Sequence, residues 1–355
     1  MSINVFNPAA GATTAQDLIL TKYIGSFEEA FRAQAMIYGS ANESNCVFKL
    51  PSTAGNAFQF LMDGQIDAPE DYQPGDTLLG QKAGSVQGII TSDKYVVAHH
   101  YIPKDQWKRW EQTPQKAANL GIQHQREIKL QMDRRIFATH ALAARAASSS
   151  TANGLLVHGG GIRKTRTGGS VATAYPKSST GAANFRSDLR DLAQQLDEAN
   201  IPREPGTRML YLTPYMNSVL LFDNTATLFS KDYIVSAGEN NDILKREVQM
   251  IEGFTVAGIP NTTTNLGSMP DQNVTTGLSK FRGNFTPAAS TGTPVAQIFC
   301  CGAAGERSVG MIEQDPLQHE MHYMPDKMSY LIMSYLLPGI GQMHPWCAAS
   351  IEVIS

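Results

Sequence analysis

The sequence feature that most restricts the fold is one long stretch, from Thr113 to Ala147, in which almost nothing breaks a helix. Thr113 and Pro114 form a helix-start signal, because the hydroxyl accepts from an early backbone N–H and proline lacks a donor where none is needed. Within the stretch only Gly121 weakens the helix. A helix of about 33 residues is about 50 Å long. The stretch therefore predicts a spine helix that crosses a whole domain.

Hydrophobic spacing predicts which side of this helix packs against the rest of the protein. One apolar stripe holds Leu120, Ile128, Met132 and Ile136, widened by Ile122, Leu130, Phe137 and Leu142. The polar side is made up of Arg126, Lys129, Asp133 and Arg134.

The rest of the chain mixes short strands with further helices, and this order predicts an α+β fold. An amphipathic helix is expected from Phe185 to near Asn200, and Thr213-Pro214 starts a short helix, 215–222. Glycine, serine, threonine and alanine dominate 148–183, so a loop or linker is expected there apart from a strand at 155–157. The other expected strands are 46–50, 89–90, 95–98, 209–212, 249–259, 296–300, 308–312, 328–337 and 348–354, with a turn-rich segment at 260–290.

Residues 52–88 contain glycine and proline too often for a helix. Strand-like segments lie on both sides of them, at Cys46–Leu50 and from Ile89 onward. We therefore expect a long hairpin excursion that reaches another molecule.

Charge and composition exclude several classes of protein. The formal net charge of −3 lacks the basic excess that tight binding to nucleic acid requires. No stretch approaches the roughly 18 apolar residues of a membrane span, and Met1–Gly11 does not resemble a signal peptide. The four cysteines, Cys46, Cys300, Cys301 and Cys347, show no metal-ligand spacing, so free thiols in a reducing compartment are expected.

Motifs typical of catalysis are incomplete. His158-Gly159-Gly160-Gly161 resembles the oxyanion loop of esterases, whose backbone N–H groups approach a developing negative charge. Such an enzyme also needs a nucleophile elbow, G-x-S-x-G, and in Gly305–Gly310 the serine, Ser308, comes one place too late. No two carboxylates form a pair suited to general acid and base catalysis.

Metal and phosphate motifs fail in the same way. His319 and His322 are three residues apart in an expected strand, where they point to opposite faces, and His99-His100 fail likewise. The basic residues Arg163, Lys164 and Arg166 are expected in a solvated loop, with contact to nucleic acid or to a neighbour's acids as the alternative. No phosphate-binding glycine loop is present. We therefore expect no catalytic, cofactor-binding or metal-binding residue.

From about Thr21 to Ser355, the order of elements resembles the major capsid proteins of tailed double-stranded DNA phages, which have the Hong Kong 97 type fold, and in particular those of short-tailed phages. The segments that carry the resemblance are an arm helix at 27–41, an extended loop at 44–51 and 71–76, the spine helix at 113–147, a strand and helix at 208–215, a glycine-containing strand at 251–256, and the closing strands from 328.

The resemblance implies four regions. These are an N-terminal arm, 1–43; an extended β-hairpin loop, 44–95; a peripheral domain, 96–150, with the spine helix and with strands from about 249–260 and 308–337; and a mainly axial domain, 151–355.

It also implies a function and partners. The chain would assemble with itself into hexamers and pentamers of an icosahedral capsid that encloses double-stranded DNA without binding it specifically. Because the chain begins almost at the arm, a separate scaffold protein is expected, with a portal, with a cement protein as a further possible partner, and with no membrane association. Although Lys82 lies in the loop, no crosslink is predicted. The expected location is the virion capsid, reached from the host cytoplasm.

Two alternatives stay open from the sequence. The first is an encapsulin-like protein compartment, which uses the same fold without phage DNA. The second is a soluble hydrolase that uses the His158 loop.

Overall fold

The computed structural model describes residues 35–51, 57–66, 71, 73–74, 77, 80, 82–92, 95–106, 115–146, 149–152, 155–204, 206–220, 250–257 and 292–354. Ala35–Ser355 forms one compact unit. The other unit, Met1–Gln34, lies outside the described residues and holds most of the expected arm. The first described helix is α2 (Glu43–Cys46).

One of the two larger sheets has the strand order β1-β12-β13-β4. Its strands are β1 (Val47–Leu50), β4 (Val96–Pro103), β12 (Val309–Met324) and β13 (Ser329–Gln342). β12 and β13 pair antiparallel and turn through the 3-10 helix η4 (Pro325–Lys327). β1 runs parallel to β12, and β4 runs antiparallel to β13. The predicted strands 308–312 and 328–337 are confirmed, and both continue further than their sequence pattern indicated.

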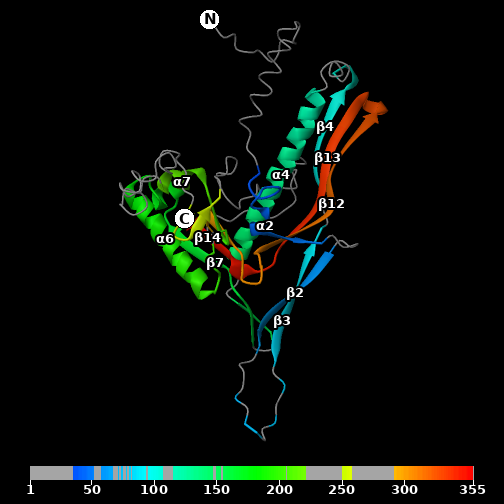
Figure 1. Ribbon diagram of the computed structural model, residues 1–355. Helices are drawn as coiled ribbons and strands as arrows, with labels where there is room; N and C mark the ends of the chain where they lie inside the picture. The colour runs from blue at the N-terminus through cyan, green and yellow to red at the C-terminus, as the bar shows by residue number, and fades with distance from the viewer. Residues whose placement is uncertain are drawn as a thin grey trace. The chain divides into compact units, whose positions relative to one another are not determined.

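The predicted spine helix is confirmed as α4 (Gln115–Ala144), whose 30 residues correspond to about 45 Å. It contacts β4, β13 and β12 and runs beside them in Figure 1. Ile128, Met132 and Ile136 are buried in a cluster with side chains of β12 and β13. Ile122 and Leu142 are 46% and 38% exposed, so the buried stripe is narrower than predicted. The expected Thr113-Pro114 start lies outside the described residues.

The second larger sheet has the order β7-β14-β11-β8-β10-β9. Its strands are β7 (Ile162–Thr167), β8 (Arg208–Leu212), β9 (Met250–Ile251), β10 (Phe254–Val256), β11 (Thr293–Cys300) and β14 (Ala348–Ile354), the last preceded by η5 (Pro345–Cys347). The predicted strands of 249–260 are represented by β9 and β10, and they belong to this sheet because β10 runs parallel to β8 and antiparallel to β9.

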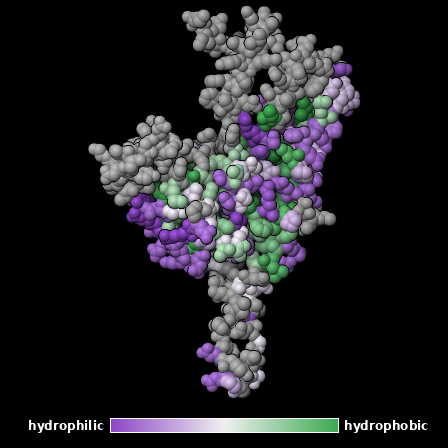
Figure 2. Space-filling view, viewed as in Figure 1, coloured by the Kyte–Doolittle hydropathy of each residue, from purple (hydrophilic) through white to green (hydrophobic). Residues whose placement is uncertain are grey.

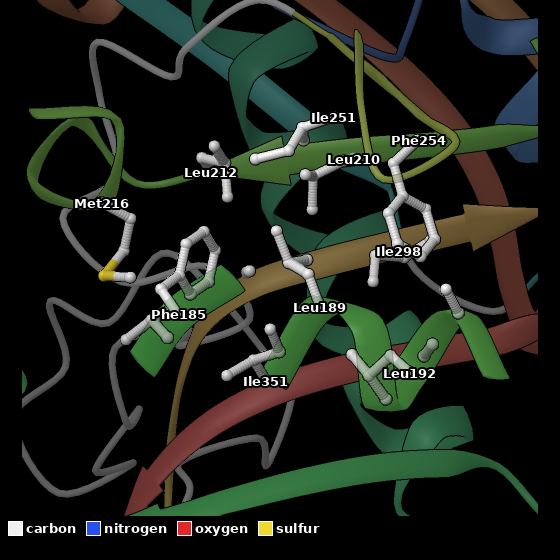
Figure 3. Close-up of a cluster of buried hydrophobic side chains, with 14 of the residues drawn as sticks. Phe185, Leu189, Leu192, Leu210, Leu212, Met216, Ile251, Phe254, Ile298 and Ile351 are labelled. Atoms are coloured by element: carbon white, nitrogen blue, oxygen red, sulfur yellow. The ribbon is translucent and has the colours of Figure 1, made fainter. Parts of the chain in front are cut away.

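Helices α6 (Ser179–Glu198) and α7 (Pro214–Leu220) confirm the two predicted helices after the spine. The hydroxyl of Thr213 accepts from the N–H of Met216 at 3.4 Å, which is the predicted cap of α7. Figure 3 shows α6 side chains lying against the six-stranded sheet. This core includes Phe185, Leu189 and Leu192 of α6 with Leu210, Leu212, Ile298 and Ile351 of the strands, all of them buried.

The strand predicted at 155–157 is confirmed as β6, but the loop predicted for the rest of 148–183 is wrong. That segment contains β5 (Ser149–Ala152), β6 (Leu155–Gly159), β7 and α5 (Val171–Ala174). β7 has no alternation of apolar and polar residues, and its parallel pairing with β14 determines its structure. Such a long-range partner leaves no local sequence signal.

A long hairpin is present where the sequence predicts one. It consists of β2 (Ala57–Ile66) and β3 (Ala83–Thr91), which pair antiparallel. β2 lies wholly, and β3 in part, within residues 52–88, which were read as loop-rich. The expected first strand of the excursion, 46–50, is corrected, because β1 pairs with β12 instead. The expected turn-rich segment at 260–290 lies outside the described residues.

Candidate assembly surfaces

The chain is fixed to the spine helix directly after residue 35. The Asp133 carboxylate of α4 accepts hydrogen bonds from the backbone N–H groups of Met36, Ile37 and Tyr38, at 3.2 Å for Ile37 and 2.8 Å for Tyr38. Burial raises the pKa of Asp133 to about 6, against the lowering effect of these three donors. The sequence placed Asp133 on the polar side of the helix, and the structure corrects this, because Asp133 is buried.

The β2–β3 hairpin has two different faces. On one face Phe58 and Phe60 pack against a small core that includes Ile90 of β3. On the other face Leu61 and Ile89 are 68% and 58% exposed. Figure 2 shows hydrophobic surface where the hairpin meets the four-stranded sheet. The hairpin therefore presents large apolar side chains to solvent, a feature typical of a surface that another protein covers.

The four-stranded sheet also has an open face, here called the outer face, which lies opposite α4. On β4, Val96 and Ile102 point inward and are buried, whereas Val97 and Tyr101 point outward and are 48% and 43% exposed. Tyr335 of β13 lies opposite Val97 on this face. The outer face thus combines apolar and aromatic side chains with charged ones, because the Tyr335 hydroxyl donates to Glu320 at 2.5 Å and the Lys327 ammonium lies 4.4 Å from the Tyr101 ring centroid.

The glycine loop after His158 has a packing role. Gly161 packs closely against the C-terminal end of α4. A Cβ at this position would overlap the carbonyl oxygen of Ala143. The backbone of His158 lies in β6, and its side chain is outside the described part of the chain. Ser308, the serine nearest to an elbow pattern, is 1% exposed, so a substrate cannot reach its hydroxyl in this structure. The geometry assembles no nucleophile, base and oxyanion hole among these residues.

The histidine candidates lie apart from any metal geometry. His319 and His322 are both in β12, as the sequence predicts, and have different partners: Ser334 at 2.6 Å and Glu320 at 2.8 Å. The ring of His100 on β4 lies 6.2 Å from that of His124 on α4. Within the described ranges, no three histidine, cysteine, aspartate or glutamate side chains are arranged to hold a metal ion.

The three basic residues expected in a loop are instead spread along β7, and each forms an ion pair. Arg163 contacts Glu352 at 2.8 Å, Lys164 contacts Asp191 at 2.6 Å, and Arg166 contacts Asp188 at 2.8 Å. Their partners are carboxylates of the same chain. This pairing offsets the basic charge that a phosphate backbone would need.

The four cysteines are free thiols, as predicted. Burial raises the pKa of both Cys46 and Cys300 to about 12, so these thiols stay protonated and unreactive at neutral pH. Among the described helices, none has the length and apolar character to span a membrane.

Solved phage capsids share this fold. A chain from the capsid of cyanophage P-SCSP1u matches with a TM-score of 0.64 at 17% identity, covering 99% of this chain and 94% of that chain. A chain from the mature capsid of bacteriophage PhiM1 matches with a TM-score of 0.67 at 16% identity, covering 99% and 92%. A chain from Mycobacterium phage Che8 gives 0.54 at 12% identity, covering 99% and 98%. The fold is therefore that of the phage capsid proteins, as the Hong Kong 97 type resemblance predicts.

Sequence comparison identifies the family. The Gp10A-like family model, described as major capsid protein, matches residues 64–352. The chain belongs to this family and is a structural subunit of a phage capsid shell. Among curated proteins, no sequence match was found.

Proposed function

We propose that this subunit assembles with copies of itself into hexamers and pentamers that close an icosahedral shell around double-stranded DNA. The observation that carries the proposal is the β2–β3 hairpin, on which Leu61 and Ile89 are exposed on the face away from Phe58 and Phe60. Large exposed apolar side chains on a projecting element are stabilised when a neighbouring subunit covers them. The shell would enclose DNA without specific binding, since β7, which carries the basic cluster, has its cations paired within the chain.

We infer that different regions of the subunit have different roles in the shell. The arm, 1–43, and the extended loop, 44–95, are proposed to reach neighbours, apart from β1, which pairs with β12 of the same chain. The four-stranded sheet with α4 is proposed as the peripheral domain, which takes in 96–150 and the strands β12 and β13. The six-stranded sheet with α6 and α7 is proposed as the axial domain within 151–355, and it takes in β9 and β10.

Other partners belong to the same proposal. We infer a separate scaffold protein and a portal during assembly in the host cytoplasm, with a cement protein as an optional addition. No residue is assigned a catalytic role, because the buried Ser308 and the packed Gly161 argue against the hydrolase alternative. The phage capsid is favoured over an encapsulin-like compartment by the family to which the chain belongs.

The experiment that tests the shell proposal is negative-stain electron microscopy with light scattering, on the chain expressed alone and with a candidate scaffold. Closed shells are expected for the wild type. In the double variant Leu61→Asp with Ile89→Asp, we expect folded subunits that do not close shells. The matched control is Gln59→Asp with Gln87→Asp, because these exposed residues lie directly opposite Ile89 and Leu61 on the same hairpin face. Normal shells from the apolar-to-Asp variant would contradict the role of the hairpin.

A further inference from the structure

The edges of the two larger sheets differ in how they are protected. An edge strand has unpaired backbone groups that can pair with another chain, and natural proteins block them with short strands, charges or proline. β9 is only two residues long. β7 carries Arg163, Lys164 and Arg166. β1 is four residues long, contains Lys49 and is followed directly by Pro51. Three of these four edges therefore have a recognised protective device.

The fourth edge, β4, has none of these devices. It is eight residues long, VVAHHYIP, with no aspartate, glutamate, lysine or arginine and no proline before its last position. β4 pairs with β13 on one side, and no second strand pairs with it among the described residues. Helix α4 packs on the inner face of the sheet and buries Val96 and Ile102. The outward-pointing Val97 and Tyr101 remain about half exposed.

We propose that the β4 edge receives an extended segment of a second copy of this chain, which adds a strand to the four-stranded sheet. Strand addition of this kind takes its binding energy from main-chain hydrogen bonds and its specificity from alternate side chains. The incoming segment would place apolar side chains beside Val97 and Tyr101, which lie four residues apart on the outer face. This inference rests on the proposed self-assembly and names one surface that performs it.

The chemistry of the edge favours a second copy over other occupants. The strand itself carries no formal charge apart from what its histidines gain in acid. The nearby ammonium of Lys327 is engaged with the Tyr101 ring, 4.4 Å from its centroid, so the edge is suited to main-chain pairing more than to a phosphate backbone. A shell subunit meets many copies of itself, so an unprotected edge would cause aggregation unless assembly covers that edge in a defined register. Once covered in this way, the edge strand no longer promotes aggregation and forms part of a subunit interface.

Amide hydrogen–deuterium exchange of the wild-type chain tests the proposal without any substitution. Free subunits and assembled shells are compared over residues 96–102. We expect exchange in the shell to slow by about tenfold or more at amides that face away from β13. The same exchange rates in both states would overturn the proposal and leave the shell function intact, whereas failure of the wild type to form shells would overturn the shell function itself.

Crosslinking identifies the occupant. p-Benzoylphenylalanine replaces Tyr101, shells are irradiated, and covalent dimers of the chain are expected on denaturing gels. A crosslink formed only within one chain, or only to another protein, would overturn the second-copy assignment. As a further test, Val97→Lys with Tyr101→Lys is expected to abolish closed shells with unchanged circular dichroism. The matched control, Thr165→Lys on the already basic edge strand β7, is expected to assemble normally.

Discussion

The carboxylate of Asp133 accepts a hydrogen bond from the backbone N–H of Tyr38 at 2.8 Å, although 95 residues separate them in sequence. The N–H groups of Met36 and Ile37 donate to the same carboxylate. The spine helix thereby holds the chain at the start of the described unit. This contact connects the proposed arm to α4, the longest of the described helices.

The pH dependence of this contact gives the first prediction. Burial raises the pKa of Asp133 to about 6, above its ordinary value of 3.8, so the folded state binds this proton more tightly than the unfolded state. The contribution to stability is complete below pH 3.8 and is lost as the pH rises through about 6. Relative to Asp133→Asn, the free energy of unfolding of the wild type should fall by about 2 to 3 kcal/mol from pH 4 to pH 7. Urea unfolding of both proteins measures this, and a difference that rises with pH would show that the three N–H donors outweigh burial.

His140 predicts the opposite trend in acid. It is fully buried on α4, donates a hydrogen bond from Nε2 to the carbonyl of Ile298 at 3.0 Å, and stacks on Phe299. Burial lowers the pKa of His140 to about 3. Below pH 6.5 the unfolded state therefore takes up a proton that the folded state does not. The free energy of unfolding decreases as the pH is lowered. Relative to His140→Leu, the wild type should lose about 2 kcal/mol between pH 7 and pH 5. Parallel pH profiles for the two proteins would contradict a neutral, buried histidine.

Glu352 joins two arginines at the end of the six-stranded sheet. Its side chain is fully buried and contacts Arg145 of the chain after α4 at 2.9 Å and Arg163 of β7 at 2.8 Å. Glu352→Gln removes the charge that both guanidinium groups share, so we expect a loss of about 3 to 5 kcal/mol in the free energy of unfolding. The control is Asp191→Asn, which breaks the partly exposed pair with Lys164 on the same strand and should cost less than about 1 kcal/mol. Equal losses would show that burial does not distinguish the two pairs.

Gly161 tests the packing role of the glycine loop. Gly161→Ala places a methyl group against the Ala143 carbonyl, so we expect a loss of about 1 to 3 kcal/mol in the free energy of unfolding, or insoluble protein. Gly80→Ala is the control, because nothing lies within 4 Å of a Cβ at that position. Thermal unfolding measures both variants. A Gly161→Ala protein as stable as the wild type would reopen the question of what this loop does.

Local patterns predicted those parts of the fold whose signal is contained in the segment itself. The spine helix has helical spacing over many turns, Thr213-Pro214 starts α7, and the closing strand 348–354 is a continuous run typical of a buried strand. β7 was missed because its residues IRKTRT form a strand only through pairing with β14 and ion pairs to distant acids. A strand that depends on long-range pairing need not show the alternation of apolar and polar residues that identifies a strand in sequence.

The candidate surfaces were predicted less completely. The long hairpin was found from its glycine and proline content, but the exposure of Leu61 and Ile89 depends on the strand register, which the sequence does not reveal. Asp133 was assigned to solvent because a carboxylate in a helix is usually solvated. Only the fold brings three backbone donors to it. Its neighbours Met132 and Ile136 in the buried stripe were the available hint.

The position of β14 determines when the six-stranded sheet can be completed during synthesis. β14 follows all other described strands in sequence, yet it lies between β7 and β11 inside the six-stranded sheet. During synthesis β7 therefore has no partner in this sheet until β14 leaves the ribosome. Ribosome-bound intermediates that lack β14 also lack the finished six-stranded sheet, so a polysome carrying such chains does not present folded copies of this sheet to one another. Competence to join a shell is therefore acquired only after β14 has been made.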